Sequence, residues 1–541
     1  MTKIFVLQKI VFYSALHIVL ILFILPSLSN LFFSGMIKYL SVSHAMANNG
    51  LLFISKATKV HSVCQRASKF VKRVLYVKVQ ESSDNTLPVL SKQIDNLYSK
   101  VRELIFQVIY IRLMLKPSDT IKEIKTGHTI DMILYDSELA KDIDELKHNI
   151  IIKLNKYLFA VPYEDPFRTY ENVALGGTFD RLHNGHKILL SQAALRATKL
   201  LTVGVTDVNM IQSKTLWELI EPVEVRIQEV LNFLMDINPD LEYNVFPLKD
   251  LYGPTKDDPK YQLIVVSEET LRGANKINEK RLENGLQPMD VHVIGMARDT
   301  HPEHSHEEED KISSSNQRMR LLGTVLRPPV PNPSIPDWPY VIGLAGGIAS
   351  GKSHIAEKLK LKGAAIVNCD IIAHELYKPG LPLNRTISEV FGQEVVTEAG
   401  EVDRKKLGQI VFSDKEQLEK LNSLVWPAVI AEAQRQIRAY GELGHRVVVM
   451  EAAVLVRARW YTHCHQLWSV IVPREEAIKR LQKRNNLTEE EATQRVNSQP
   501  SNRQQIANAN VVFSPYWSYK YTQGQVDRAW QSLEEFLAER K

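Results

Sequence analysis

The sequence contains few cysteines, and its first eighty residues contain no acidic side chain. Only three cysteines occur among 541 residues, and they are widely spaced. A disulfide framework and a cysteine-based zinc site are therefore not expected, and we predict that the chain works in a reducing compartment. The length is sufficient for two or three domains, each with its own hydrophobic core.

Basic and acidic residues are distributed unevenly along the chain, because the acidic ones are missing from its first part. Residues 1–80 contain ten lysines or arginines, and the first acidic residue is Glu81. The remainder carries 57 basic and 62 acidic residues, so the formal net charge of +5 originates in the N-terminal segment. Because the rest of the chain is slightly acidic, we expect no nucleic-acid partner.

The N-terminal segment also has an uncharged, apolar stretch. Residues 10–37 lack charge and Ile10–Leu25 is almost wholly apolar, which approaches the roughly 20 residues that a membrane-spanning helix needs. The acid-free, basic stretch Met46–Lys78 resembles a mitochondrial targeting segment. We therefore expect residues 1–80 to target or anchor the protein, in mitochondria or on their cytoplasmic face, with a cytoplasmic pool compatible with both. A non-native upstream extension is the alternative.

Residues 81–168 show no recognisable catalytic pattern. Apolar residues at helical spacing predict helices within Lys92–Leu115 and Glu138–Tyr157, and Met132–Leu134 could form a short strand. We expect an N-terminal α+β extension that packs against other parts of the molecule or forms an interface.

The sequence GGIASGKS at Gly346–Ser353 has the spacing of a P-loop. It follows the apolar run Tyr340–Ala345 and precedes a helical pattern, which is the context that the motif requires. Backbone N–H groups of such a turn bind a polyphosphate at a helix N-terminus. Lys352 would reach the β- and γ-phosphates of ATP, and the Ser353 hydroxyl would ligate Mg²⁺. The predicted nucleotide-binding residues are Gly346, Gly347, Ser350, Gly351, Lys352 and Ser353.

A second strand–turn–helix pattern begins at Asn172–Leu175. The turn reads GGTFDRLHNGH, from Gly176 and Gly177 to His186, and a glycine-rich turn before a helix can again bind phosphate. His183 and His186 are three residues apart, so both imidazoles lie on one side of the helix start. Two such donors suit the charge that develops on an α-phosphate under attack. Zinc binding, or two surface histidines without a function, are the alternatives.

This turn resembles the histidine motif of the nucleotidylyltransferase superfamily. The second signature of that family appears as ISSSNQR at Ile312–Arg318, about 125 residues further on. Small hydroxyls and N–H groups at a helix start can hold the departing β- and γ-phosphates. The resemblance implies this role for Ser313, Ser314, Ser315 and Arg318. Alternating apolar strands and helices between the two signatures predict a Rossmann-like α/β order.

Within that superfamily, residues Glu171–Leu326 resemble phosphopantetheine adenylyltransferase. Further matching pieces are Ser213–Lys214, YGPT at Tyr252–Thr255 and VVSEETLRG at Val265–Gly273. The resemblance implies that Thr178 and His186 stabilise the transition state at the α-phosphate, and that Lys214 and Arg272 hold the attacking phosphate and ATP. The pantetheine phosphate would attack directly, without a protein nucleophile. Asn275 stands where bacterial enzymes have a second arginine.

A proline-rich stretch separates this region from the P-loop. Residues 327–339 read RPPVPNPSIPDWP and contain six prolines, so they cannot enter a helix or a central strand. We expect a semi-rigid linker between domains at residues 169–326 and 340–541.

From Tyr340 to about Pro515 the chain resembles dephospho-coenzyme A kinase. Besides the P-loop, the matching pieces are Asp370, His374, Pro379–Gly380, Asp403–Arg404, Val411–Phe412 and the segment from Leu421–Asn422 to Trp426–Pro427. The resemblance implies that Asp370 accepts the proton of the ribose 3′-hydroxyl, and that Arg480 and Arg484 are lid arginines that close over the transferring phosphate. A turn-capping aspartate and a solvated, charged helix face are the alternatives.

The order of these regions resembles the animal-type bifunctional coenzyme A synthase. We expect an α/β protein with a Rossmann-like nucleotidylyltransferase domain, a P-loop kinase domain and the N-terminal extension. The implied substrates are ATP with Mg²⁺, 4′-phosphopantetheine and dephospho-CoA. Two rival interpretations are an aminoacyl-tRNA synthetase, whose two signatures the histidine motif and KISSS at 311–315 also resemble, and a membrane-tethered nucleotide-binding scaffold with an inactive site.

Overall fold

The computed structural model describes two main stretches and several short ones. The described residues are 168–299, 301–302 and 304–540, with 47–54, 71–79, 110–113, 132–135, Cys64, Ser91, Ile94, Asp95 and Tyr98. The chain divides into two compact units, 1–167 with 235–240, and 168–234 with 241–541. The predicted apolar segment Ile10–Leu25 and the predicted helix Glu138–Tyr157 lie outside the described residues. Among the described residues, no helix is both long and apolar enough to cross a bilayer.

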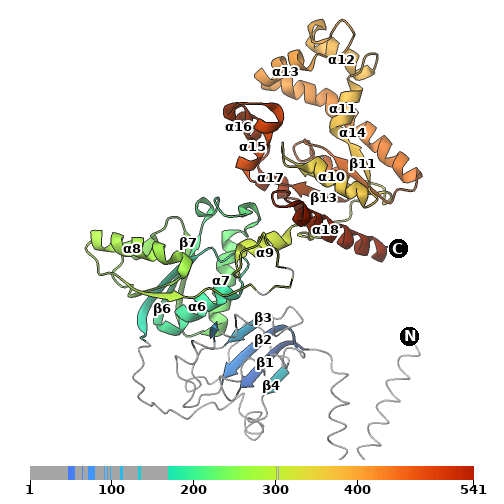
Figure 1. The fold of residues 1–541 in the computed structure, drawn as a ribbon. Helices are drawn as coiled ribbons and strands as arrows, with labels where there is room; N and C mark the ends of the chain where they lie inside the picture. Colours follow the sequence, from blue (N-terminus) through green and yellow to red (C-terminus); the bar gives the residue numbers. More distant parts are fainter. Residues whose placement is uncertain are drawn as a thin grey trace, which may run out of the picture. The chain divides into compact units, whose positions relative to one another are not determined.

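The first unit contains a four-stranded sheet in which all paired strands are parallel (blue in Figure 1). Its order is β3-β2-β1-β4, formed by β1 (Ala47–Ile54), β2 (Val71–Val79), β3 (Tyr110–Leu113) and β4 (Met132–Tyr135). The strand expected at Met132–Leu134 is confirmed.

This sheet differs from two expectations. Residues 110–113, placed in a predicted helix, form β3 instead. Residues 47–54 and 71–79 fall within the segment that we assigned to targeting, yet they form two paired strands whose apolar side chains Leu52, Ile54, Leu75 and Val77 are buried. The described pairings of this sheet are all parallel, so its strands are not joined as hairpins.

Residues 168–326 form the first α/β domain of the second unit (teal to yellow-green in Figure 1). Its parallel sheet has the order β7-β6-β5-β8-β9, and the first four strands in chain order take the same positions as in the blue sheet. The strands are β5 (Tyr170–Gly177), β6 (Ala197–Thr206), β7 (Glu242–Leu248), β8 (Leu263–Ser267) and β9 (Asp290–Ile294). The helices are α6 (Asn184–Arg196), α7 (Val223–Ile237), α8 (Leu271–Glu283) and α9 (Ser314–Leu321), with short 3₁₀ turns η6 (Val208–Met210), η7 (Trp217–Leu219), η8 (Gly253–Lys256) and η9 (Glu268–Thr270). The predicted Rossmann-like order is confirmed.

Residues 340–540 form the second α/β domain, around a parallel sheet of order β11-β12-β10-β13-β14. The strands are β10 (Tyr340–Gly346), β11 (Ala365–Asn368), β12 (Val447–Glu451), β13 (Gln466–Val470) and β14 (Val511–Phe513). The helices are α10 (Lys352–Leu361), α11 (Cys369–Leu376), α12 (Pro382–Phe391), α13 (Arg404–Ser413), α14 (Lys415–Glu442), α15 (Arg474–Asn485), α16 (Glu489–Asn497), α17 (Asn502–Ile506) and α18 (Tyr519–Glu539), with η10 (Gln393–Val395) and η11 (Trp460–His463).

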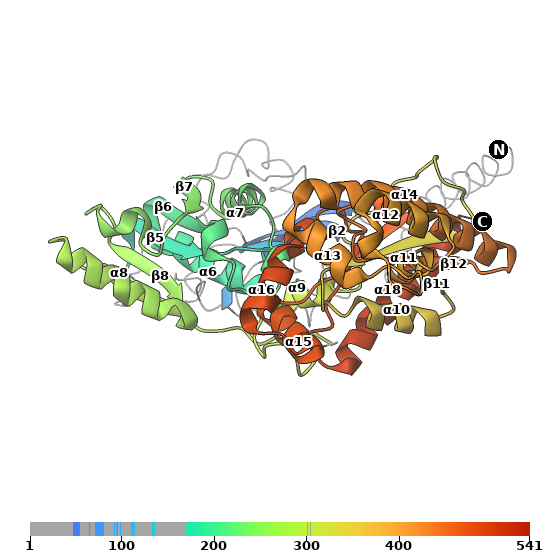
Figure 2. The same cartoon turned by 90° about the horizontal axis from the view of Figure 1, so that it is seen from above.

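Two hydrophobic clusters cover the two faces of this sheet. One holds apolar residues of α10 and α18, and the other holds those of α11 to α14; Figure 2 shows the two sets of helices on opposite sides. The central strand β10 is buried along its whole length. The P-loop therefore leaves the middle of the sheet at the carboxyl ends of its strands, where ligands bind in open α/β folds.

The chain between the two α/β domains pairs with the second sheet. The Gly323 N–H donates to the Val512 carbonyl at 2.9 Å, and the Leu326 N–H donates to the Asn510 carbonyl at 2.7 Å. Val325 forms an antiparallel bridge with Val511 of β14. Arg327, the first residue of the predicted linker, donates to the carbonyl of Ala509 at 3.0 Å. The start of the linker is thus fixed to the second domain.

Candidate active sites

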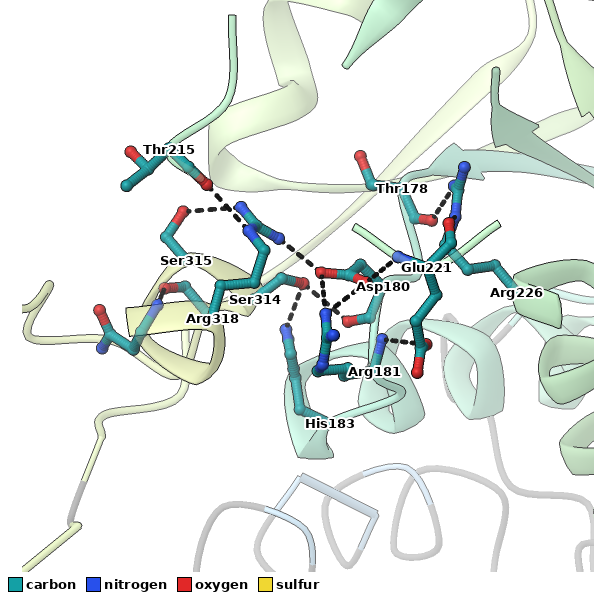
Figure 3. A network of polar contacts seen from close by, with 12 residues as sticks. Thr178, Asp180, Arg181, His183, Thr215, Glu221, Arg226, Ser314, Ser315 and Arg318 are labelled. Atoms are coloured by element: carbon teal, nitrogen blue, oxygen red, sulfur yellow. Dashed lines mark hydrogen bonds and ion pairs between the residues drawn. The ribbon is translucent and has the colours of Figure 1, made fainter. Parts of the chain in front are cut away.

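The first site is built around the buried carboxylate of Asp180, in the turn between β5 and α6. Its neighbours Phe179 and Arg181 both have left-handed backbone angles, with φ of 51° and 48°. The Asp180 carboxylate forms a buried ion pair with Arg318 at 2.6 Å and accepts the Glu221 N–H at 3.0 Å (Figure 3). This aspartate, which the sequence analysis did not single out, therefore joins the two signature motifs.

The guanidinium of Arg318 makes three contacts within the protein. Its side chain is only 1% exposed. Besides the ion pair with Asp180, its Nε donates to the Thr215 carbonyl at 2.8 Å and its Nη2 to the Ser315 hydroxyl at 3.4 Å (Figure 3). We expected Arg318 to hold the departing phosphates; here it fastens α9 to the turn and to the loop of Lys214.

The two histidines of the motif stack face to face, with ring centroids 3.7 Å apart. His183 caps α6, because its Nδ1 accepts the His186 N–H at 3.4 Å, and its Nε2 lies 3.3 Å from the Ser314 hydroxyl. A side chain at Gly185 would approach the His183 ring to 3.2 Å. The glycine of the motif therefore leaves room for this stacking.

His186 is held in a setting that keeps its imidazole neutral. Its Nδ1 is buried and has no hydrogen-bond partner among the described residues. Burial lowers the pKa of His186 to about 3, with Lys214 and Arg318 adding to the effect and Asp180 opposing it. A neutral imidazole can donate one hydrogen bond, so it suits stabilisation of developing phosphate charge. Over the residues that the structure describes, no cluster of three metal-ligating side chains occurs.

The remaining residues predicted for this site fall into two groups. The Thr178 hydroxyl accepts from Thr206 at 3.1 Å, and its carbonyl accepts from the buried Arg226 at 2.6 Å. Lys214 is an exposed residue of the loop between β6 and α7; partial desolvation by neighbouring groups lowers its pKa, and the nearby Arg318 adds to the shift. Arg272 is also exposed, in the first turn of α8. Gly176 and Gly177 end β5, and Ser313 caps α9.

The second site is the P-loop turn between β10 and α10. Gly351 has φ of 90°, and a side chain there would meet Pro515 at 2.7 Å. A side chain at Gly346 would meet the Val470 carbonyl at 2.8 Å. The Ser350 Oγ is buried without a partner among the described residues, and its N–H donates to the Gly347 carbonyl at 3.2 Å. Only glycine fits the two tight positions, which explains the motif at this turn.

A buried glutamate at the end of β12 organises this second site. Glu451 is 2% exposed, and one of its oxygens accepts from Lys352 at 3.1 Å and from the Ser353 hydroxyl at 2.7 Å. Its other oxygen accepts from Asn368 at 3.0 Å. We missed Glu451 in the sequence, although an acidic residue directly after the apolar strand VVVM was a usable signal.

These oxygen donors fit the Mg²⁺ that the P-loop implies. A serine hydroxyl and a carboxylate 2.7 Å apart, next to the lysine of the P-loop, are ligands of the type that Mg²⁺ prefers. In P-loop proteins the hydroxyl at the position of Ser353 binds the metal and an acidic residue at the end of a neighbouring strand supports it. Ser353 and Glu451 are therefore the residues that would hold it here.

Asp370 lies beside these groups and faces solvent. Its side chain is 47% exposed, and one oxygen lies 3.8 Å from Lys352 Nζ. The other oxygen accepts the Ala453 N–H at 3.5 Å. Asp370 sits in the first turn of α11, so its carboxylate is accessible to a substrate hydroxyl and close to the P-loop lysine.

The two predicted lid arginines differ in position. Arg480 donates to the Pro515 carbonyl at 2.8 Å and to Glu476 at 2.6 Å, next to the P-loop. Arg484 is exposed and donates to the adjacent Asn485. Gln499, which we did not predict, accepts the Ile348 N–H of the P-loop turn at 2.7 Å. Thus the structure brings Arg480 and Gln499, but not Arg484, into contact with the phosphate-binding region.

Comparisons with known proteins agree with this arrangement. The dephospho-CoA kinase family model matches residues 340–515, and the cytidylyltransferase-like model matches residues 174–320. A dephospho-CoA kinase of Carboxydothermus hydrogenoformans is 37% identical over 186 residues, which cover 34% of this chain and 90% of that protein. The chain belongs to the dephospho-CoA kinase family.

Other relatives carry the same name. A dephospho-CoA kinase of Bacillus cereus is 41% identical over 174 residues, covering 32% of this chain and 87% of that protein. The solved dephospho-CoA kinase of Campylobacter jejuni is 24% identical, with a TM-score of 0.29, and covers 36% of this chain and 97% of its own. The family model places residues 340–515 in the kinase domain. The cytidylyltransferase-like domain that precedes it in the same chain is consistent with a bifunctional coenzyme A synthase.

Proposed function

We propose that the chain carries out the last two steps of coenzyme A synthesis. The first domain would transfer an adenylyl group from ATP to 4′-phosphopantetheine, giving dephospho-CoA and pyrophosphate. The kinase domain would then phosphorylate the ribose 3′-hydroxyl of dephospho-CoA, giving CoA and ADP. The observation that carries the proposal is the presence of two separate phosphate-binding turns, each beside its own buried acid.

In the first step, the phosphate of phosphopantetheine would attack the α-phosphorus of ATP, and pyrophosphate would leave. No protein nucleophile is needed, because positioning and charge stabilisation can supply the rate. We assign the α-phosphate to neutral His186 and to Thr178, and the attacking phosphate to Lys214. The N-terminus of α9, with Ser313, Ser314 and Ser315, would bind the leaving pyrophosphate.

In the second step, Asp370 would accept the proton of the 3′-hydroxyl as that oxygen attacks the γ-phosphorus of ATP. Its carboxylate is exposed to solvent and close to Lys352, which supports this role. Lys352 would bind the β- and γ-phosphates, and Arg480 would stabilise the transferring phosphoryl group. Ser353, with support from Glu451, would hold Mg²⁺, which would supply charge neutralisation at the phosphates. We also propose a mitochondrial location for the protein, which rests on the basic, acid-free composition of residues 1–80.

Mass spectrometry of the products from phosphopantetheine and MgATP tests both steps. The unmodified chain should yield CoA, pyrophosphate and ADP. Lys352→Met should stop at dephospho-CoA, because the β- and γ-phosphates lose their cation. His186→Ala should form no dephospho-CoA from phosphopantetheine, yet should still convert added dephospho-CoA to CoA.

An exposed lysine on the same helix provides the control. Lys360→Met should make CoA at the normal rate, because Lys360 is remote from the P-loop turn. Absence of both dephospho-CoA and CoA from the unmodified chain would reject the two-step proposal and favour a nucleotide-binding scaffold. Charging of tRNA in place of these products would favour the synthetase interpretation.

A further inference from the structure

The loop that carries Lys214 is anchored in the kinase domain. This loop joins β6 to α7, and its residues Leu216 and Leu219 are only 8% and 7% exposed. Both belong to a hydrophobic cluster whose other members are mostly residues of the kinase domain, among them Ile471, Ile506, Ala509 and Val512. Burial of two leucines here stabilises the loop by removing apolar surface from water.

A side-chain hydrogen bond joins the two domains beside this apolar contact. The side-chain amide of Asn502, the first residue of α17, donates to the Glu218 carboxylate at 2.8 Å. The same amide nitrogen donates to the Val472 carbonyl at 2.8 Å. Asn502 therefore links η7 of the first domain to the chain just after β13 of the kinase domain.

Lys214 cannot move independently of this anchored turn. Its carbonyl accepts the Trp217 N–H at 3.1 Å, and its own N–H donates to the Ile211 carbonyl at 2.9 Å. Between them, Leu216 has a left-handed φ of 51°, a conformation that a leucine keeps only when its surroundings fix it. The Thr215 carbonyl accepts from Arg318 at 2.8 Å, which ties the same loop to the histidine turn.

We propose that helix α17 of the kinase domain completes the first active site. Asn502 acts as a positioning residue: through Glu218 and η7 it holds Lys214 where the attacking phosphate of phosphopantetheine binds. This inference rests on the proposed function of the first domain. It implies that Asn502, a residue of the kinase domain, influences the affinity of the first site for phosphopantetheine.

Steady-state kinetics of the full-length Asn502→Ala variant tests the inference. Pyrophosphate release reports the first step, and ADP release from added dephospho-CoA reports the second. Loss of the hydrogen bond should raise the KM for phosphopantetheine about three- to tenfold. The KM for ATP in the first step and the kcat of the kinase step should stay within about twofold, because the proposal assigns Lys214 to the attacking phosphate and gives it no part in the kinase site.

Two comparisons separate positioning from a general loss of folding. Arg503→Ala alters an exposed residue of the same helix and should leave the KM for phosphopantetheine unchanged. Glu218→Ala should match Asn502→Ala, and the double variant should be no worse than either one, because both remove the same contact. Additive effects, or equal KM values in Asn502→Ala and Arg503→Ala, would overturn the inference. If the unmodified chain releases no pyrophosphate from phosphopantetheine, the proposed function fails instead.

Discussion

At the scale of single residues, each site depends on one buried carboxylate paired with a cation. Asp180 holds Arg318, and Glu451 holds Lys352 and Ser353. The two pairs differ in how many protein contacts the cation makes, and so in how readily the cation could bind a ligand. All three nitrogens of Arg318 are engaged by protein atoms, whereas Lys352 and Ser353 share a single oxygen. The three bonds of Arg318 fasten separate segments of the protein together, while the contact that Lys352 and Ser353 share with Glu451 can be exchanged for a ligand.

His186 provides a prediction at this scale. Because its folded-state pKa is lowered to about 3, the unfolded chain binds a proton between about pH 3 and 6.5 that the folded chain does not. Stability should therefore fall as the pH drops below about 6.5, by at most about 1.4 kcal/mol per pH unit from this residue. Calorimetry of His186→Asn between pH 7 and 5 should show a shallower decline in Tm than the unmodified chain.

The exposed His306→Asn variant is the matched control for this measurement. Its Tm should follow the unmodified chain at each pH. Parallel curves for all three proteins would show that His186 is not held neutral by its surroundings.

At the scale of elements, helix α15 presents two arginines to different environments. Arg480 lies against Pro515, and one of its nitrogens is 3.6 Å from the position of a side chain built on Gly351. Arg484 is exposed in the last turn of the same helix. A helix turns by about 100° per residue, so positions four apart share a face but lie about one turn apart along the axis. Only the earlier arginine reaches the P-loop.

Substitution of the two arginines should therefore have unequal effects on the kinase step. Arg480→Ala should lower kcat about a hundredfold, because it removes a positive charge next to the transferring phosphate. Arg484→Ala should change kcat less than about threefold. Initial rates of ADP release with saturating dephospho-CoA measure both. If both variants lost the same factor in kcat, α15 would have to move closer to the nucleotide than it lies in this structure, so that Arg484 also reaches the phosphate.

At the scale of the whole molecule, the two α/β domains share a core. Leu216, Leu219, Met319 and Leu322 of the first domain belong to the same cluster as the residues beneath α11 and α14 of the second. Residues 323–326 then run along β14, joined to it by an isolated antiparallel bridge and backbone hydrogen bonds. Unfolding of one domain would expose apolar surface of the other, so we expect residues 168–540 to lose structure cooperatively.

Heat inactivation tests this cooperativity. The midpoints for pyrophosphate release and for ADP release should coincide in the unmodified chain. Leu322 is fully buried, and Leu322→Ala should destabilise the unit by about 2–5 kcal/mol and lower both midpoints together. Leu361→Ala, at an exposed leucine of the kinase domain, should leave both unchanged. A kinase activity that outlasts the first activity on heating would mean that the domains unfold separately.

The sequence was sufficient to predict features that depend on neighbouring residues. Both phosphate-binding turns, their strand–turn–helix contexts and the α/β order of the two domains follow from local spacing and periodicity. It could not reveal contacts between distant residues. Asp180 and Arg318 are 138 positions apart, Ser353 and Glu451 are 98 apart, and Glu218 and Asn502 are 284 apart. Charge composition also gave no sign of the strands at 47–54 and 71–79, because a basic, acid-free stretch can still pair as strands.

The segment 323–326, which is bridged antiparallel to β14, has a consequence for solubility. β14 ends the order of its sheet, and an uncovered edge offers free N–H and C=O groups to which another chain can attach. The N–H groups of Gly323 and Leu326 donate hydrogen bonds to backbone carbonyls along this edge, within the same molecule. The segment that links the two domains thereby also blocks edge-to-edge aggregation. If the chain were cut just after Leu326, the free kinase fragment would expose the edge of β14 and should aggregate more readily.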